Sequence, residues 1–446
     1  SSFACGLEYE DLSPRVVHQI KRTVVDTLGC AVGGFHSEPA TIARTLAGSV
    51  TSSTPSRILG TQLYSSPDMA GFANGVMVRY LDCNDSYFSP GGGHPSDMIP
   101  AALALGGPTE SDGRSVITAI ALAYEVFCRL SDEVVTGEFG WDQGMFSIIG
   151  ATCAAGKLLG LNQERMGHAI SLAIAPNLPL GVTRTGELSM WKGCATATAT
   201  RAGIFAAQLA QQGMTGPNEP FEGRRGLWEQ ALGNTVNIPS FQKSRGSDDF
   251  RILETTFKSY PSQIHTQAPI GVALELHDQV AAEKITSVLI QSYGGAVSSP
   301  ATEPQKWDPK TRETADHSIP YLVAVALRYG SVDAGSFTSE RIHDPALRTL
   351  MAKFAMEEIP DFTTRYPEEF NCRIQVSDDA GMVYEAHTRY PKGHRHNPLD
   401  DKEVEAKFRG LAADIVSSKQ CDRVLEQVWA LDEAHNLDSL FDSMVV

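Results

Sequence analysis

The sequence lacks several patterns that would place it in a familiar class of protein. Its 446 residues contain eight cysteines, but no two of them form a Cys-x-x-Cys pair. This absence removes the usual signature of a structural zinc site and of an iron–sulfur cluster. Scattered cysteines in apolar segments favour reduced, buried thiols in a cytosol-like compartment over a disulfide framework.

Long apolar runs and concentrated basic segments are also missing. No stretch approaches the roughly eighteen uncharged apolar residues of a membrane span, so we expect none. The first residues, Ser-Ser-Phe-Ala-Cys-Gly, lack the basic start and apolar core of a signal peptide. The formal net charge of −16 argues against nucleic acid, because phosphate binding requires a concentrated basic surface. We therefore expect a cytoplasmic protein without membrane or nucleic-acid partners.

Common catalytic signatures are absent as well. The chain has no Gly-x-Ser-x-Gly elbow, no Walker phosphate loop and no His-Glu-x-x-His motif. Its first half shows no alternation of strands and helices, which argues against a Rossmann-type enzyme. Apolar residues recur there at helical spacing instead. The predicted helices span 12–35, 38–47, 66–82, 98–106, 112–132, 144–160, 163–175, 188–213 and 219–232.

The character of the chain changes after about residue 258. Segment 285–293 is rich in β-branched residues, and 372–384 is typical of a hairpin with Asp-Asp-Ala-Gly as its turn. Helices are predicted near 267–282, 313–329 and 344–356, and again in the tail from about 400. We therefore predict a mainly α protein. An all-helical domain is built from both chain ends, 1–258 and 392–446, and an α+β domain is inserted at 259–391.

Residues 79–97 gather several chemically useful groups. Asp82 and Asp85 lie three apart, so they share one face of a helix end. A Pro-Gly-Gly-Gly turn then precedes His94, and a triple glycine lets the backbone take φ > 0 and approach a ligand closely. Taken alone, the stretch fits either a small-molecule site or an Asp-capped turn with a surface histidine.

Lys192 stands near the predicted start of a long helix of small residues. A cation is unfavourable at that end of the helix dipole, whereas an anionic ligand there interacts favourably with both lysine and dipole. Arg184, just upstream, adds a second cationic group for carboxylate binding. The alternative is a solvated lysine beside a packed Trp191.

Two further residues suit proton transfer. His265 falls where the helical domain gives way to the α+β domain, a kind of crevice that ligand sites favour, although a structural histidine is the alternative. Tyr321 can donate a proton without being ionised. It follows Asp316 and Ser318, either of which is a candidate N-cap. The loop 390–398 carries two histidines, and we interpret it as an exposed, anion-friendly loop rather than a metal site.

Six groups of residues resemble the MmgE/PrpD family and run in its order over nearly the whole chain. They are Asp26-Thr-Leu-Gly-Cys30, Tyr80-Leu-Asp-Cys-Asn-Asp85 with Gly93-His-Pro-Ser96, Met190-Trp-Lys-Gly193, Gly213-Met-Thr-Gly-Pro217, Ala315-Asp-His-Ser-Ile-Pro-Tyr321 and Tyr390-Pro-Lys-Gly-His394. The resemblance implies a helical domain formed by both chain ends, an inserted α+β lid and a homodimer. It also implies an active site between domain and lid.

The family's functional residues can be carried over position by position. The catalytic ones implied are Asp82, His94, Lys192, His265 and Tyr321. Asp82 is expected to orient His94 and tune its charge. Some relatives align their histidine with Gln267 rather than His265. The residues predicted to bind substrate are Arg184, Ser86 and Gln143. Gln143 is a departure, because many relatives have a histidine in or beside the Trp141-Asp-Gln143 triplet.

The family's reactions share the need to make or quench a carbanion beside a carboxylate. The resemblance therefore implies a dehydratase without cofactor or metal, acting on a di- or tricarboxylate of the 2-methylcitrate type. Lys192 and Arg184 would hold carboxylates. His94 or His265 would act as base, and the other histidine or Tyr321 would protonate the leaving hydroxyl.

Three alternatives remain beside the dehydratase. One is decarboxylation of the cis-aconitate type. Another is epimerisation or isomerisation at a carbon α to a carboxylate, as in iminodisuccinate epimerase. Because Gln143 replaces a family histidine, a protein that binds a carboxylate without turning it over is the third.

Overall fold

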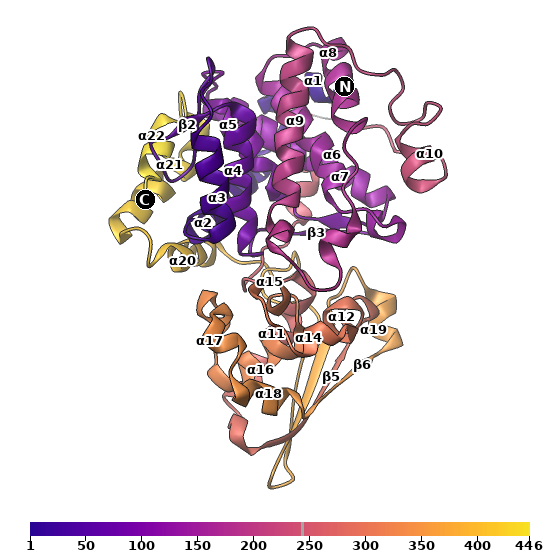
Figure 1. Ribbon diagram of the computed structural model, residues 1–446, viewed down its shortest axis with the longest axis vertical. Coiled ribbons are helices and arrows are strands. Elements are labelled where there is room, and N and C mark those ends of the chain that lie inside the picture. The colour runs from indigo at the N-terminus through magenta and orange to yellow at the C-terminus, as the bar shows by residue number, and fades with distance from the viewer. Residues whose placement is uncertain (242–244) are drawn as a thin grey trace. The chain divides into compact units, whose positions relative to one another are not determined.

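The computed structural model describes residues 1–241 and 245–446 (Figure 1). The chain forms two compact units. The first comprises Ser1–Gly181, Gly193–Thr255 and Asp400–Val446; the second comprises Val182–Lys192 and Thr256–Leu399. Helices dominate the order of elements, so the predicted mainly α class is confirmed. Within the described ranges, no helix combines the length and the apolar character needed to cross a membrane.

The first unit consists almost entirely of helices. Its longer helices are α2 (Pro14–Gly33), α3 (Glu38–Gly48), α4 (Pro67–Tyr80), α5 (Ile99–Gly106), α6 (Gly113–Glu133), α7 (Gly144–Leu158), α8 (Gln163–Ile174), α9 (Ala195–Gln211), α20 (Asp401–Ala412) and α21 (Ser418–Trp429). Shorter ones are α1 (Ser2–Gly6), α10 (Leu227–Leu232) and α22 (Asp438–Ser443). Two small antiparallel sheets pair β1 (Ser56–Arg57) with β2 (Tyr64–Ser65), and β3 (Tyr87–Phe88) with β4 (Gly92–Gly93).

Small residues allow the helices of the first unit to approach one another closely. Helix α7 is mostly apolar and is buried from Gly144 to Gly156, and it packs against α6, α8 and α9. A Cβ on Gly203 of α9 would lie 2.9 Å from the Thr152 nitrogen in α7. The C-terminal helix α20 packs on α2, where a Cβ on Gly29 would lie 3.1 Å from Phe408 Cα. Both chain ends therefore share one core.

The second unit is built around a four-stranded sheet in the order β6-β5-β7-β8. Strand β5 (Ile285–Ser292) pairs in parallel with β6 (Phe354–Glu358) and antiparallel with β7 (Cys372–Asp378), which forms a hairpin with β8 (Val383–Thr388). The predicted strand and hairpin are confirmed. Helix α11 (Gln267–His277) packs on β7 and β8 and against α16 (Ile319–Tyr329). The remaining helices are α12 (Gly294–Val297), α13 (Ser299–Thr302), α14 (Pro304–Trp307), α15 (Arg312–Ala315), α17 (Ser339–Ile342), α18 (Pro345–Met351) and α19 (Pro360–Arg365).

Strand β6 replaces the end of a predicted helix. The expected helix over 344–356 ends at Met351, and Phe354–Glu358 forms an edge strand instead. Its Phe-Ala-Met-Glu-Glu sequence has good helix formers, so pairing with β5 outweighs the local preference.

Candidate functional site

The loop after α4 turns sharply at Asp82. Asp82 has φ = 52°, a left-handed conformation that residues other than glycine seldom adopt. The short β3–β4 hairpin then brings the chain back to His94. Asp82, Ser86 and His94 are all buried, so the alternative of a surface histidine is excluded. Within the first unit, the loop places an aspartate, a serine and a histidine close together.

Hydrogen bonds to the His94 ring fix its orientation and the nitrogen that carries its proton. Its Nδ1 lies 2.7 Å from the backbone oxygen of Asp85, which can only accept, so Nδ1 carries the proton. Ser86 Oγ is 3.1 Å from the same nitrogen, and Gln143 Oε1 accepts the backbone N–H of His94 at 2.8 Å. Nε2 of the neutral ring therefore bears the lone pair, and it lies 3.8 Å from Asp82 Oδ1. This arrangement suits a general base.

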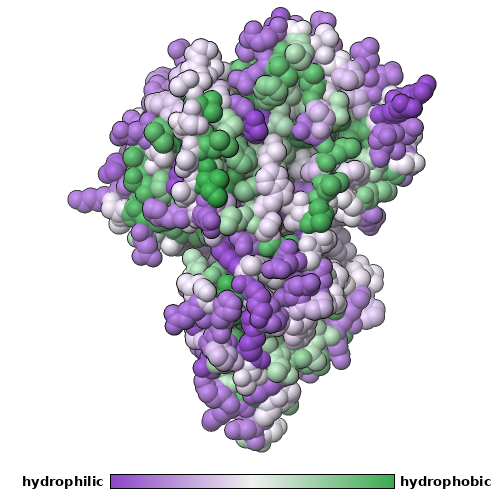
Figure 2. Space-filling model, in the orientation of Figure 1, coloured by the Kyte–Doolittle hydropathy of each residue, from purple (hydrophilic) through white to green (hydrophobic). Residues whose placement is uncertain are grey.

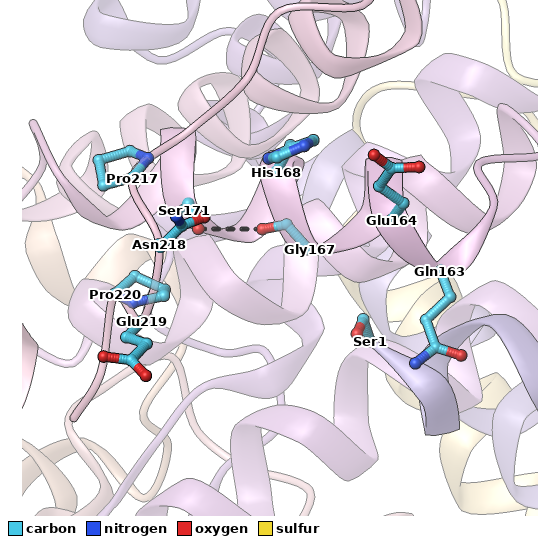
Figure 3. A pocket seen from close by; sticks show the side chains of 10 residues that line it. All are labelled: Ser1, Gln163, Glu164, Gly167, His168, Ser171, Pro217, Asn218, Glu219 and Pro220. Atoms are coloured by element: carbon cyan, nitrogen blue, oxygen red, sulfur yellow. Dashed lines mark hydrogen bonds between the residues drawn. The ribbon is translucent and has the colours of Figure 1, made fainter. Parts of the chain in front are cut away.

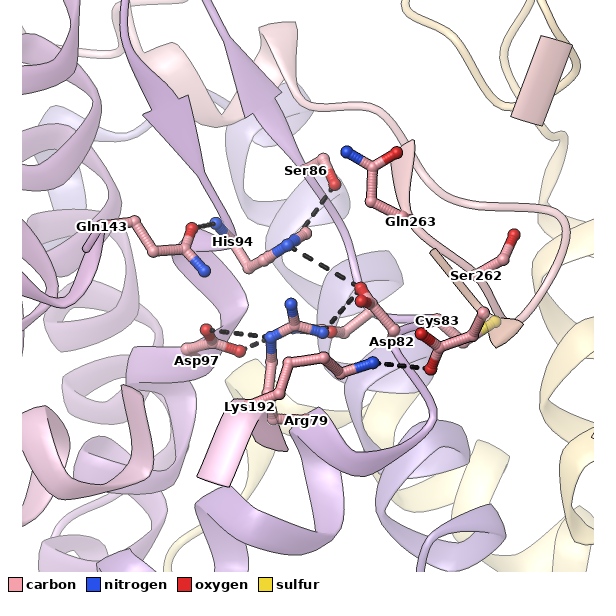
Figure 4. Close-up of polar contacts among 12 residues, drawn as sticks. Arg79, Asp82, Cys83, Ser86, His94, Asp97, Gln143, Lys192, Ser262 and Gln263 are labelled. Carbon is pink, nitrogen blue, oxygen red and sulfur yellow. Dashed lines mark hydrogen bonds and ion pairs between the residues drawn. The ribbon is translucent and has the colours of Figure 1, made fainter. Parts of the chain in front are cut away.

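Arg79 links two buried carboxylates beside the histidine. It donates to Asp82 Oδ1 at 2.6 Å, and its Nε lies 3.7 Å from Asp97 Oδ2 (Figure 4). Asn84 donates to the other oxygen of Asp97 at 2.8 Å. Sequence analysis did not single out Arg79 or Asp97. The available signal was an arginine that directly follows the apolar run Val76-Met-Val78, because a buried charge requires a partner.

Asp85 supports the loop through its side chain. Its two carboxylate oxygens accept from the Ser96 backbone at 3.0 Å and from the Tyr124 hydroxyl at 2.8 Å. Burial raises the pKa of Asp85 to about 7, although both hydrogen bonds act in the opposite direction. Its role is therefore to fix the chain that carries His94, with its backbone oxygen holding the imidazole.

The C-terminal helix α20 also supports this loop. Lys407 Nζ contacts Asp26 Oδ1 at 2.5 Å and donates to the backbone oxygen of Cys83 at 2.7 Å. Burial alone would lower the pKa of Lys407, but Asp26 and the thiols of Cys83 and Cys30 raise it above its usual value. Residues from both ends of the chain therefore position the segment that follows Asp82.

The three glycines before His94 serve a purpose that differs from the expected one. The prediction of φ > 0 is wrong, because none of residues 91–93 has a positive φ. A Cβ on Gly93 would lie 1.8 Å from Gln143 Oε1, and one on Gly91 would lie 2.2 Å from the Val134 oxygen. The glycines thus allow close packing against the protein itself, and Gly93 makes room for the amide that binds His94.

In the second unit, Lys192 is buried and paired with Asp316. It lies in a 3-10 turn (Met190–Gly193) that precedes α9, so the predicted helix start at 188 is wrong. Its Nζ donates to Asp316 Oδ2 at 2.6 Å, and Arg312 donates to the same oxygen at 3.1 Å. Arg184 donates to the Lys192 backbone oxygen at 2.7 Å. The alternative of a solvated lysine is excluded.

Asp316 is the centre of this second cluster. His317 Nδ1 lies 2.6 Å from its Oδ1. Burial alone would raise the pKa of Asp316, but Lys192, His317 and Arg312 together hold it below its usual value. The N-cap of α16 is Ser318, whose Oγ accepts from the Tyr321 backbone N–H. Asp316 is therefore not the cap, and its carboxylate pairs with the cations instead. Sequence analysis treated Asp316 only as a candidate cap.

The structure does not join Tyr321 to this cluster by any contact among the described residues. The tyrosine is buried, its hydroxyl donates to the Ser336 backbone oxygen at 2.5 Å, and burial raises its pKa. His265 is half-buried, with Nδ1 2.7 Å from the Tyr293 hydroxyl. Burial lowers the pKa of His265 to about 4, assisted by His317 and Lys258, so the ring is neutral near pH 7.

Gln267, the other position considered for a family histidine, has a structural role. Its Oε1 accepts from the backbones of Ser259 and Tyr260 at 2.9 and 3.0 Å, and its Nε2 donates to the Ser262 hydroxyl at 3.0 Å. The buried amide therefore ties the segment before α11 to the helix.

A surface pocket in the first unit offers different chemistry (Figure 3). It has a volume of about 490 Å³ and lies beside α8. Its lining includes Glu164 and Glu219 but no lysine or arginine. An anionic molecule would meet repulsion there, so the two buried clusters are the better candidates for a carboxylate site.

The fold and these clusters together define a class of protein. The fold is mainly helical. One cluster holds a buried imidazole fixed as a proton acceptor, and the other gathers cations around a buried carboxylate. These groups suit acid–base chemistry on a carboxylate-bearing molecule. Residues 1–238 match the MmgE/PrpD N-terminal domain and residues 260–431 match the MmgE/PrpD C-terminal domain. The chain belongs to the MmgE/PrpD family, as its sequence motifs predict.

Relatives with named activities resemble the chain over most of its length. The 2-methylcitrate dehydratases of Salmonella typhimurium and Escherichia coli are each 26% identical, over 453 and 451 residues, with 94% of this chain and 91% of each relative covered. The cis-aconitate decarboxylase of Homo sapiens is 24% identical over 455 residues, with 99% and 91% covered. These names agree with the predicted lyase class and with both the main and the first alternative activity.

Proposed function

We propose that the protein is a dehydratase that acts on a di- or tricarboxylate of the 2-methylcitrate type. The observation that carries the proposal is the fixed tautomer of His94, with Nδ1 donating to Asp85 at 2.7 Å and Nε2 left as the acceptor. The dehydratase names of relatives that cover most of the chain support the same reaction.

In this proposal His94 removes a proton from the carbon α to a carboxylate. The proton goes to Nε2, and the Asp82 carboxylate, 3.8 Å away, stabilises the imidazolium that forms. Arg79 keeps Asp82 in place through its 2.6 Å hydrogen bond. Lys192 and Arg184 supply positive charge for substrate carboxylates and for the enolate-like charge that develops.

The leaving hydroxyl requires a proton, so that water departs as the double bond forms. His265 is neutral near pH 7 because its pKa is about 4, and the Tyr321 hydroxyl donates to a backbone oxygen. We assign the donor role to His317, because the Asp316 carboxylate 2.6 Å from its Nδ1 stabilises the imidazolium form. The predicted catalytic roles of His265 and Tyr321 stay predictions.

Incubation of the protein with a panel of carboxylates in D₂O, followed by NMR, tests the proposal. An alkene product supports the dehydratase. Loss of CO₂ identifies a decarboxylase, the second candidate, which the human relative's name favours. Deuterium exchange with every carbon retained identifies an epimerase, and calorimetric binding without turnover identifies a binder.

The proposal also includes a cytoplasmic homodimer with the second unit acting as a lid. Apolar side chains at least half exposed occur on α3 and on the β1–β2 hairpin, at Ile42, Leu46, Leu63 and Tyr64. Figure 2 shows hydrophobic residues on this part of the first unit. Such exposed apolar groups are compatible with a protein–protein interface.

A further inference from the structure

A second buried lysine lies beside the Asp316 cluster of the second unit. Lys306 belongs to α14, and its side chain is 1% exposed. Its backbone oxygen accepts a hydrogen bond from the Ser318 hydroxyl, which also caps α16. Lys306 is therefore fixed at the start of the helix that directly follows Asp316 and His317.

The ammonium of Lys306 has no hydrogen-bond partner among the described residues. The nearest carboxylate oxygen recorded is Glu303 Oε2 at 3.8 Å, which is too long for a hydrogen bond. That oxygen also has no hydrogen-bond partner in the described part of the chain. A buried ammonium that makes no hydrogen bonds destabilises a folded protein, so this group calls for a functional explanation.

Lys306 also lies within electrostatic range of the residues around Asp316. Burial lowers the pKa of Lys306; Glu303 and Asp316 raise it, and Lys192 lowers it further. Asp316 already accepts from both Lys192 and Arg312 through one oxygen. Three cations thus lie near two carboxylates, and the set is Lys192, Arg312 and Lys306 with Asp316 and Glu303. Glu303 makes only a long ion pair with Lys306. An anion would complete the hydrogen bonds and balance the charge.

We propose that Lys306 binds a carboxylate of the substrate and so selects for molecules with more than one carboxylate. The inference rests on the proposed function, because the role of Lys306 requires that the protein turns over a polycarboxylate. The lysine binds a carboxylate away from the reacting carbon, so the contact is equally strong in the ground state and in the transition state. Such a contact affects KM rather than kcat.

Steady-state kinetics of Lys306→Met and Glu303→Gln on the best polycarboxylate tests this role. Lys306→Met keeps the side-chain length and removes the charge, so KM is expected to rise about tenfold to a hundredfold with kcat within about threefold. Glu303→Gln is the matched control: it breaks the same ion pair but leaves the lysine, so KM should stay the same or fall. Thermal melts of both variants report any loss of folding.

A merely structural ion pair gives a different pattern. It predicts equal losses of thermal stability in the two variants and an unchanged KM, and that result overturns the inference. If Lys306→Met does not fold, Lys306→Arg, which keeps the charge but moves the donors, must raise KM for the inference to stand. Calorimetry separates the two proposals: binding of tricarboxylate that weakens in Lys306→Met supports the inference even without turnover. A wild-type protein that binds none of the carboxylates overturns both.

Discussion

At the scale of single residues, the protonation of His94 decides what the first cluster can do. A backbone oxygen cannot change its role as an acceptor, so the bond to Asp85 fixes the tautomer more firmly than a side-chain partner would. Sequence reasoning predicted that Asp82 orients the ring. In the structure the Asp85 backbone oxygen holds Nδ1, and Asp82 Oδ1 lies 3.8 Å from Nε2 on the other side of the ring, so the role of Asp82 stays a prediction. A carbonyl contact of this kind has no sequence signal, because every residue has a carbonyl.

Replacement of His94 tests its role as base. His94→Gln removes the proton acceptor, and kcat is expected to fall by about 10²- to 10⁴-fold, the usual contribution of general base catalysis. Ser89→Ala is the matched control: it lies in the same loop, and its hydroxyl donates to the Ser131 backbone oxygen at 3.3 Å rather than to the imidazole, so activity should fall by less than about tenfold. Equal losses in the two variants would show that the loop rather than the imidazole carries the activity.

At the scale of elements, the loop between α4 and α5 depends on buried polar contacts. Sequence analysis located this loop and its acidic and imidazole groups. It misjudged the glycines. A glycine can be needed for positive φ or for lack of space, and the sequence alone does not distinguish these two reasons; the neighbouring atoms in the structure do. Likewise, β6 escaped prediction because its partner β5 lies more than sixty residues away.

The pH dependence of stability tests the burial of Asp85. Its pKa is about 7 in the folded protein and 3.8 ordinarily, so between these values the folded state holds a proton that the unfolded state releases. Stability therefore falls as pH rises through this window. Asp85→Asn cannot ionise, so it avoids the cost of a buried charge at high pH. The Tm of Asp85→Asn minus the Tm of wild type should therefore be larger at pH 8 than at pH 5. Thermal unfolding at both pH values measures this, and a difference that does not vary with pH contradicts the account.

At the scale of the whole molecule, the sequence indicated the mainly α class and the family, while the partners of the site residues came only from the structure. Lys192 was singled out from the helix dipole argument, yet it precedes α9 and pairs with Asp316, 124 residues further along. Segment 182–192 belongs to the second unit, although it lies within the run of first-unit helices. Such long-range pairings have no local pattern, so periodicity and spacing cannot reveal them.

The proposed homodimer is a property of the whole molecule. Sedimentation velocity of the wild-type protein should give twice the mass of one chain. Leu46→Glu places a charge among the exposed apolar side chains of α3 and should shift the equilibrium toward monomer, whereas Thr45→Glu on the same helix is the matched control. A wild-type monomer at micromolar concentration contradicts the homodimer.

The most direct test of the central claim is the NMR assay of carboxylate turnover in D₂O, run on wild type and His94→Gln side by side. The account predicts that wild type converts a 2-methylcitrate-type substrate to an alkene with all carbons retained, and that His94→Gln binds the same substrate but forms the product at least about a hundredfold more slowly. Loss of CO₂ from the substrate, or an equal rate in the two proteins, would contradict it.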